Sequence, residues 1–257
     1  MVDVMLTLAA HGYPGKILAI SRRGLMPRAH RWTVAPTTFA VDMEDVGSPD
    51  AVFRQIWQHL SRNPQENWRA VVDSLRPHTQ TIWKNWSGED RRRFTSEYRA
   101  YWDVRRHRIA PEIATKLNGF LESGKLGILS GSLRSIALND SGTLDALIAP
   151  SARGAEPITE TVIGAVNCTG PDSELSRSPQ SILHQLRDKG LIRADEAGLG
   201  MDVDDTGAIL DALGVPADDL FSIGPTSKAQ LFEITAVPDI RTQAAQLADV
   251  LLDRLVR

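Results

Sequence analysis

The spacing of apolar positions near the start of the chain predicts a helix followed by a strand. Apolar residues over 1–12 recur at helical intervals, and Gly12 closes this segment in the way typical of a helix C-terminus. The run from Ile17 to Ile20 is short and continuously apolar, which favours a strand that ends at Ser21. An irregular basic segment then extends to about Pro36.

Residues 50–122 change to helical spacing and contain five of the six tryptophans. Because Pro64, Pro77 and Pro111 separate the segments, we expect several amphipathic helices that form a helical insertion. Tryptophans clustered at this spacing are interpreted as core rather than as a platform for a ligand. The five tryptophans are Trp57, Trp68, Trp83, Trp86 and Trp102, and the periodic apolar positions include Val52, Ile56, Leu60, Val71, Val72, Leu75, Phe94, Tyr98 and Tyr101.

From residue 125 onward the pattern returns to short strands. Residues 125–130 form one apolar run. Residues 132–138 and 143–149 flank the turn-forming stretch 139–142, which predicts a β-hairpin. Residues 161–167 are expected to form a further, buried strand.

The last third of the chain is predicted to hold short strands between two helices. The first helix covers about 178–189, strands lead to 219–225, and a long helix runs from Ala236 to Leu255. Strands that bracket helices in this way predict an α/β fold with a mainly parallel sheet. The long helix carries one apolar stripe, expected to pack on the segment 221–224, made of Ile240, Ala244, Leu247, Leu251 and Leu255.

Charge is unevenly distributed along a chain whose formal net charge is −3. This small negative value argues against a generally basic protein that coats nucleic acid. Between Asp3 and Asp42 there is no carboxylate, whereas five cations fall in the same window. Such a local field attracts anions such as phosphate groups, and a solvated basic loop is the alternative interpretation. The five cations are Lys16, Arg22, Arg23, Arg28 and Arg31.

Ser21, Arg22 and Arg23 stand where the first predicted strand ends. In a dinucleotide-binding βαβ unit, an acidic residue at this place binds a free ribose 2′-hydroxyl, whereas arginines accommodate a 2′-phosphate. The stretch therefore favours NADP(H) over NAD(H).

The single cysteine, Cys168, has no partner for an intrachain disulfide, which favours a reducing, cytoplasmic compartment. We interpret it as a buried small residue rather than a reactive thiol, since no cation or base neighbours it in sequence. No secretory leader or apolar run of membrane-spanning length is found, and the six histidines lack metal-ligand spacing.

Arginines are dense over 91–93 and 105–108, with Tyr98, Tyr101 and Trp102 between them. An RNA-binding surface is one interpretation, but arginines clustered on a helix more often form a solvated face, so nucleic acid is not the expected partner. A third interpretation directs His107 and Arg108 toward a nicotinamide or substrate cleft.

Several stretches taken together resemble the bacterial FAD/NAD(P)-binding domain proteins, flavoproteins with two dinucleotide-binding domains that are similar in layout to N-hydroxylating flavin monooxygenases. The stretches span nearly the whole chain. They are Ala19-Ile-Ser-Arg-Arg-Gly-Leu-Met-Pro-Arg-Ala-His30, Tyr101-Trp-Asp-Val-Arg-Arg-His-Arg-Ile-Ala-Pro111, Val166-Asn-Cys-Thr-Gly-Pro171, Phe221-Ser-Ile-Gly-Pro225 and Leu231-Phe-Glu-Ile-Thr-Ala-Val-Pro-Asp-Ile-Arg241.

The resemblance implies cofactor-binding roles for residues in four places. Ser21, Arg22 and Arg23 match the position of the NADP 2′-phosphate. Thr169, Gly170 and Pro171 match the family's strand-end turn, which leads back toward the FAD domain. Gly224 and Pro225 match a turn near the flavin ribityl chain. Thr235, Ala236 and Val237 match the segment whose backbone amides face the flavin pyrimidine ring.

The resemblance also implies a domain organisation. Residues 1–49 and 123–170 match a Rossmann-like NADP-binding domain, residues 50–122 the helical insertion, and residues 171–257 the C-terminal part of an FAD-binding domain. The two Gly-rich turns of the family have no counterpart here, so the NADP-binding domain lacks its first strand and turn. We therefore expect this chain alone to lack the family's seat for the FAD pyrophosphate.

The activity implied is NADPH-dependent FAD oxidoreduction, of monooxygenase type, with hydride passing from NADPH to FAD and electrons on to oxygen or another acceptor. A small molecule is the expected substrate, and a separate N-terminal chain or a second copy is the expected protein partner. The alternative is a non-catalytic remnant or interaction module that does not bind FAD.

Overall fold

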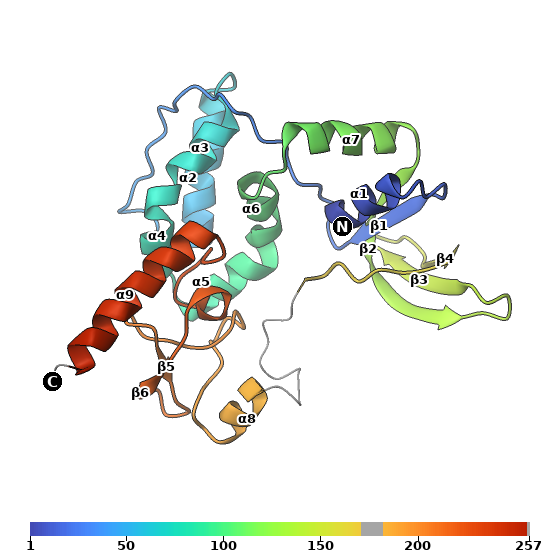
Figure 1. Ribbon diagram of the computed structural model, residues 1–257. Helices are drawn as coiled ribbons and strands as arrows, with labels where there is room; N and C mark the ends of the chain where they lie inside the picture. The colour runs from blue at the N-terminus through green and yellow to red at the C-terminus, as the bar shows by residue number, and fades with distance from the viewer. Residues whose placement is uncertain (171–181, 256–257) are drawn as a thin grey trace. The chain divides into compact units, whose positions relative to one another are not determined.

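The computed structural model describes residues 1–170 and 182–255, which form two compact units (Figure 1). Unit 1 consists of Met1–Ala35 and Arg99–Gly170, and unit 2 of Pro36–Tyr98 with the described residues that follow Pro171. The fold is α/β, as the sequence predicts. The division at Tyr98 falls inside the predicted helical segment, so its helices are shared between the two units.

Unit 1 contains a four-stranded sheet in the order β1-β2-β3-β4, formed by β1 (Ile17–Ser21), β2 (Leu126–Leu138), β3 (Leu144–Pro150) and β4 (Ile158–Val162). The β1–β2 pair is parallel, and the other two pairs are antiparallel. The sheet is therefore mixed, and the prediction of a mainly parallel sheet is wrong. A hairpin connection folds β3 back on β2, and such short connections produce antiparallel pairs.

The strand β2 is one long element where the sequence predicts two. Its first half, up to Ser130, pairs with β1, and its second half, from Gly131, pairs with β3. At Gly131 the strands come so close that a Cβ would lie 2.8 Å from the carbonyl oxygen of Ala149. Only glycine fits this position without a backbone shift, so Gly131 lets the strand change partners without breaking.

The predicted hairpin is confirmed, with Asn139 organising its turn. The Asn139 Oδ1 accepts hydrogen bonds from the backbone N–H groups of Ser141 and Thr143, both at 3.1 Å. Gly142 has a positive φ of 74°. An asparagine that binds the backbone and a left-handed glycine are typical of such turns.

Three helices belong to unit 1: α1 (Val2–Ala10), α6 (Arg99–Arg106) and α7 (Pro111–Glu122). The predicted first helix is confirmed, and Gly12 follows it with a positive φ of 67°. In the core, Met5 of α1 and Leu117 of α7 are buried with Leu126 of β2. The two helices thus cover the parallel part of the sheet (Figure 1).

The predicted buried strand over 161–167 is wrong. The strand β4 ends at Val162, where it pairs with Leu144, the first residue of β3. Residues 163–167 have no further β3 residue to pair with, and Ile163 is 77% exposed. Cys168 follows in this irregular stretch and is exposed, so its interpretation as a buried residue is also wrong.

The helices of unit 2 that precede residue 99 are α2 (Pro49–Arg62), α3 (Trp68–Ser74), α4 (Thr79–Asn85) and α5 (Gly88–Arg93), with a 3₁₀ turn η1 (Arg76–His78) and a π-helical turn η2 (Phe94–Tyr98). Side chains cap three of them: Ser48, Asn67 and Ser87 each accept a hydrogen bond from a backbone N–H of the first helical turn. The predicted helical character of this segment is confirmed.

Aromatic side chains form the centre of unit 2. The ring of Trp83 stacks on Phe232 at 4.6 Å between centroids, and Phe94 packs edge-on against both. The indole N–H of Trp83 donates to the carbonyl oxygen of Ala229 at 2.7 Å. Trp86 and, in unit 1, Trp102 are buried too, whereas Trp57 is 56% exposed. The core interpretation therefore holds for Trp83, Trp86 and Trp102 and is wrong for Trp57.

The later part of unit 2 consists of α8 (Ile182–Asp188), the hairpin pair β5 (Ala208–Leu210) and β6 (Pro216–Phe221), a 3₁₀ turn η3 (Gly224–Ser227) and α9 (Val237–Leu255). The predicted helix over 178–189 is found in α8, and its first four residues lie outside the described part. The predicted long C-terminal helix is confirmed as α9.

The apolar stripe of α9 is half-buried at Ile240, Ala244 and Leu247 and exposed beyond them. Ile240 lies against Gly224, within 3.7 Å of the place a Cβ would occupy there. Leu251 and Leu255 are 39% and 83% exposed. This end of α9 is instead held by Arg254, which donates to the Asp218 carbonyl and lies over the Phe221 ring. In the described ranges, no helix combines the length and apolar character needed to cross a membrane.

We expect Trp83→Phe to lower the free energy of unfolding by about 1–3 kcal/mol, because the buried Ala229 carbonyl loses its indole donor. Trp57→Phe makes the same change at an exposed position and should cost less than about 0.5 kcal/mol. Urea unfolding of both variants measures the difference. Equal losses would contradict the role given to Trp83.

Candidate functional site

The turn after β1 presents Ser21, Arg22 and Arg23 at the carboxyl end of the parallel pair, where Ser21 lies opposite Ser130 of β2. Gly24 has a positive φ of 60°, and its N–H donates to the Ser21 hydroxyl oxygen at 3.0 Å. The Ser21 Oγ therefore stabilises the turn, while its hydroxyl hydrogen remains available to an external acceptor.

The backbone of Arg22 is fixed, and its side chain is exposed. The Arg22 carbonyl oxygen accepts hydrogen bonds from the hydroxyl groups of Ser130 at 3.1 Å and Ser151 at 2.9 Å. Among the residues that the structure describes, the Arg22 guanidinium has no hydrogen-bond or ion-pair partner. A cation held by a rigid backbone at the end of a parallel strand pair is suited to bind an anion.

Tyr101 of α6 positions Arg23. The Arg23 guanidinium lies over the Tyr101 ring, 5.0 Å from its centroid, and its Nη1 donates to the tyrosine hydroxyl at 3.4 Å. A cation–π contact of this kind limits the orientations of the guanidinium. Sequence reasoning missed Tyr101 as part of the site, although Tyr101 stands in a stretch that carries the family resemblance.

Two more arginines lie near this place in unit 1. The segment of Arg28 runs beside the end of α6, because the Arg28 N–H donates to the Val104 carbonyl at 2.9 Å. Arg105 is half-buried and donates to the carbonyl oxygen of Tyr101 at 3.0 Å. Burial lowers the pKa of Arg105, and the positive charge of Arg28 lowers this pKa further. The two cations therefore repel each other at a partly desolvated place.

The next predicted site residues, Thr169 and Gly170, lie in an exposed turn at the end of unit 1. The Asn167 Oδ1 accepts from the N–H of Thr169 at 3.0 Å and from its hydroxyl at 2.7 Å. Gly170 has a positive φ of 82°. No described hydrogen bond joins these residues to Ser21, Arg22 or Arg23, and Pro171 lies outside the described residues.

Gly224 and Pro225 open the turn η3 in unit 2, where Gly224 is buried and has a positive φ of 75°. The Gly224 N–H donates to Oε1 of the buried Gln243 at 2.7 Å, and Gln243 Nε2 donates to the Ser227 hydroxyl at 3.0 Å. Ser227 in turn donates to the Gly224 carbonyl at 2.8 Å. The Gly224 N–H is therefore already bonded within this ring of hydrogen bonds. Pro225 is exposed.

Thr235, Ala236 and Val237 are exposed at the start of α9. The Thr235 N–H donates to the Glu233 carbonyl at 2.7 Å. No described residue accepts a hydrogen bond from the N–H groups of Ala236 and Val237. These two amides and the positive end of the helix dipole are available to an external acceptor.

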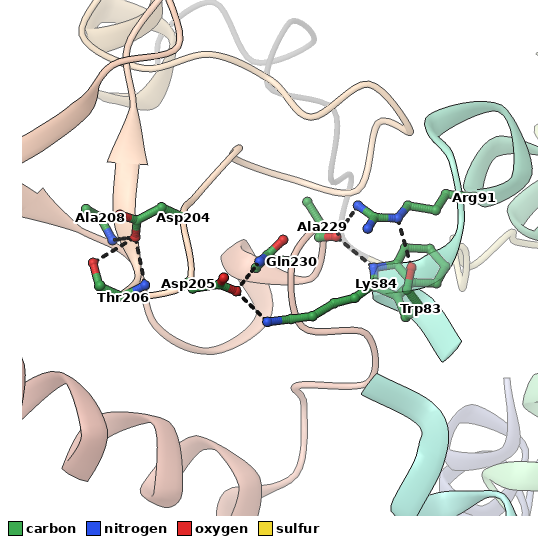
Figure 2. A network of polar contacts seen from close by, with 9 residues as sticks. All are labelled: Trp83, Lys84, Arg91, Asp204, Asp205, Thr206, Ala208, Ala229 and Gln230. Atoms are coloured by element: carbon green, nitrogen blue, oxygen red, sulfur yellow. Dashed lines mark hydrogen bonds and ion pairs between the residues drawn. The ribbon is translucent and has the colours of Figure 1, made fainter. Parts of the chain in front are cut away.

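A cavity of about 370 Å³ lies elsewhere in unit 2, between α4, the 203–207 loop and α9, and sequence reasoning did not anticipate it. Lys84 pairs with Asp205 at its wall, and Gln230 donates to the same carboxylate at 2.7 Å (Figure 2). The hydrogen bond from Lys84, followed by that from Gln230, lowers the pKa of Asp205. None of the predicted flavin-contact residues that the structure describes lines this cavity.

Arg91, Arg92 and Arg93, considered above as an RNA surface, make contacts within unit 2. Arg91 donates hydrogen bonds to the backbone carbonyls of Trp83 and Ala229 (Figure 2). The Ala229 carbonyl also accepts a hydrogen bond from the Trp83 indole. Arg92 donates to the Glu196 carbonyl at 3.2 Å, and Arg93 pairs with Asp50. The three guanidinium groups are therefore engaged within unit 2, which argues against a nucleic-acid surface at 91–93.

The comparisons with known proteins add no family to this geometry. No protein-family model matches the chain, and a search of curated proteins finds no match either.

We expect Gln243→Ala to lower the free energy of unfolding by about 2–4 kcal/mol, because it leaves the buried Gly224 N–H and the Ser227 hydroxyl without their partner. Gln246→Ala makes the same change at an exposed position of α9 and should cost less than about 0.5 kcal/mol. Denaturant unfolding of the pair checks this. Similar losses in both variants would show that the ring at Gly224 contributes nothing.

Proposed function

We propose that unit 1 binds the 2′-phosphate of NADPH at the end of β1, as part of an NADPH-dependent FAD oxidoreductase of monooxygenase type. The observation that carries the proposal is the exposed Arg22 guanidinium, which lacks a described partner and whose backbone is fixed by Ser130 and Ser151. Arg23, whose guanidinium lies over the Tyr101 ring, supplies a second planar set of N–H donors in the same turn. Arginine forks match the geometry of a phosphate group.

The arrangement of unit 1 supports a Rossmann-like interpretation of its parallel part. The helix α1 precedes β1, α7 precedes β2, and both helices share a core with the parallel pair. In open α/β sheets, ligands bind outside the carboxyl ends of the strands. Ser21 ends β1, and Ser130 opposite it is the last residue of β2 in the parallel ladder.

The residues at the start of α9 fit a flavin. When bound, the flavin and nicotinamide would supply the hydride and electron transfer, and the protein would orient them. The N–H groups of Ala236 and Val237 would donate to the polar edge of the flavin pyrimidine ring, and the helix dipole would stabilise negative charge there. Thr235 and Pro225 are exposed and suited to contact. Thr169 and Gly170 lie in a turn that begins well beyond the end of β4, so they do not stand at a strand end and contribute no argument for the flavin.

A second candidate function, a non-catalytic interaction module, is favoured by one observation. The Gly224 N–H, expected near the flavin ribityl chain, already donates to Gln243. The two candidates differ in one measurable property. A flavin contact at α9 predicts that riboflavin, which needs no diphosphate seat, binds and that Val237→Pro, which removes one free amide, weakens this binding, whereas an interaction module predicts no flavin binding to weaken.

We expect Arg22→Ala to weaken NADPH binding by about 10-fold to 100-fold and to leave NADH binding unchanged, since a charge-assisted bond contributes about 1.5–3 kcal/mol. Arg31→Ala removes an exposed arginine of the same basic window and should leave the ratio of NADPH to NADH affinity unchanged. Calorimetric titration of both nucleotides against each variant gives the ratios. An unchanged ratio in Arg22→Ala would overturn the 2′-phosphate assignment.

A further inference from the structure

Arg28 and Arg105 form a pair of like charges that the fold holds together. Backbone hydrogen bonds fix the place of Arg28, because its N–H donates to Val104 at 2.9 Å and its carbonyl accepts from the Ile109 N–H at 3.0 Å. Arg105 is anchored on the same helix end, where it donates to the Tyr101 carbonyl at 3.0 Å. The two side chains therefore start from neighbouring backbone positions of unit 1, and the positive charge of Arg28 acts on Arg105.

No described carboxylate pairs with either arginine. Asp103 lies close in sequence, but its carboxylate pairs with Arg99 at 3.3 Å and with His107 at 3.8 Å. Burial and the charge of Arg28 together disfavour the charge of Arg105. Two neighbouring cations without a counter-ion, one of them partly desolvated, are relieved electrostatically by a bound anion.

In the described part of the chain, no helix N-terminus follows β1 directly, although such a terminus is the usual binding place of a nucleotide phosphate. After β1 the chain runs without a helix over the described residues 22–48, until α2 begins at Pro49. A dinucleotide diphosphate usually rests on the N-terminus of a helix that follows a strand. In unit 1 the side chains of arginines supply the positive charge instead.

We propose that Arg28 and Arg105 form a second anion-binding site, which holds the 5′-phosphoryl group of the nucleotide whose 2′-phosphate binds Arg22 and Arg23. This inference rests on the proposed function. Tyr101 and Arg105 are four residues apart on α6, so they lie on one face, separated by about one helical turn of 5.4 Å. Since Arg23 lies over Tyr101, one ribose can place its two phosphoryl groups at the two sites.

Three probes test the proposal by calorimetry at one fixed salt concentration: adenosine 2′,5′-bisphosphate, adenosine 2′-monophosphate and inorganic diphosphate. We expect the bisphosphate to bind about tenfold or more tightly than the 2′-monophosphate, the gain typical of a charge-assisted contact. Arg28→Met and Arg105→Met should abolish this gain and leave the affinity for the 2′-monophosphate within about twofold. Arg134→Met, on the exposed second half of β2, is the matched control and should change neither affinity.

Arg105→Lys keeps the charge without the planar fork and should retain part of the gain. If Arg105→Met does not fold, the exposed Arg28 side chain carries the test, because its removal leaves the backbone contacts in place.

Equal affinity for the bisphosphate and the 2′-monophosphate would overturn the second site. Binding of inorganic diphosphate that is lost in Arg28→Met, with no binding of the 2′-monophosphate, would support the anion site while overturning the proposed function. Single-stranded RNA that competes as strongly as the bisphosphate, phosphate for phosphate, would overturn the nucleotide assignment in favour of nucleic acid.

Discussion

The close approach of two backbones at Gly131 is the constraint on which unit 1 depends. Here β2 leaves β1 and begins to pair with β3, and a side chain on residue 131 would collide with the carbonyl of Ala149. The residue before it, Ser130, ends the parallel ladder opposite Ser21 and binds the Arg22 carbonyl. The position of the arginine turn therefore follows from the place where β2 changes partner.

Charge at that strand end is organised by aromatic and backbone groups rather than by carboxylates. Arg23 rests on the Tyr101 ring, and Arg105 donates to the Tyr101 carbonyl. One residue of α6 thus orients two cations without neutralising either. Carboxylates beside these arginines would form ordinary surface ion pairs, which contribute little to stability. Such pairs would also neutralise the positive charge that a bound anion requires. Positive potential is therefore preserved where the proposed ligand binds.

Unit 2 is stabilised differently, by side chains that form hydrogen bonds with buried backbone groups. The Ala229 carbonyl accepts from the Trp83 indole and from Arg91, and Gln243 links the Gly224 amide to Ser227. Both arrangements satisfy buried polar groups that would otherwise destabilise the fold. The Gln243 bonds also tie the turn η3 to α9, the helix at whose start the exposed amides of Ala236 and Val237 lie.

Local sequence determined the elements whose cause is local. Helical spacing and Gly12 predicted α1, the turn chemistry of Asn139 predicted the hairpin, and the periodic apolar residues of 50–98 predicted helices. The window without carboxylates between Asp3 and Asp42, and the arginines at the end of β1, were also readable from the sequence alone. These properties depend on neighbours within a few positions, which a sequence displays directly.

The tertiary structure decided the features that depend on contacts between segments distant in sequence. The apolar run 161–167 predicted a buried strand, but β3 begins at Leu144 and leaves it without a pairing partner, so Ile163 and Cys168 are exposed. The stripe of α9 continues in sequence to Leu255, yet it is half-buried only as far as Leu247, and Leu251 and Leu255 are exposed. Tyr101 and Arg105 became part of the site because α6 packs beside residues 23–28, more than 70 positions earlier in the chain. Periodicity predicts which face of an element is apolar, whereas the length of the neighbouring element determines how much of that face is buried.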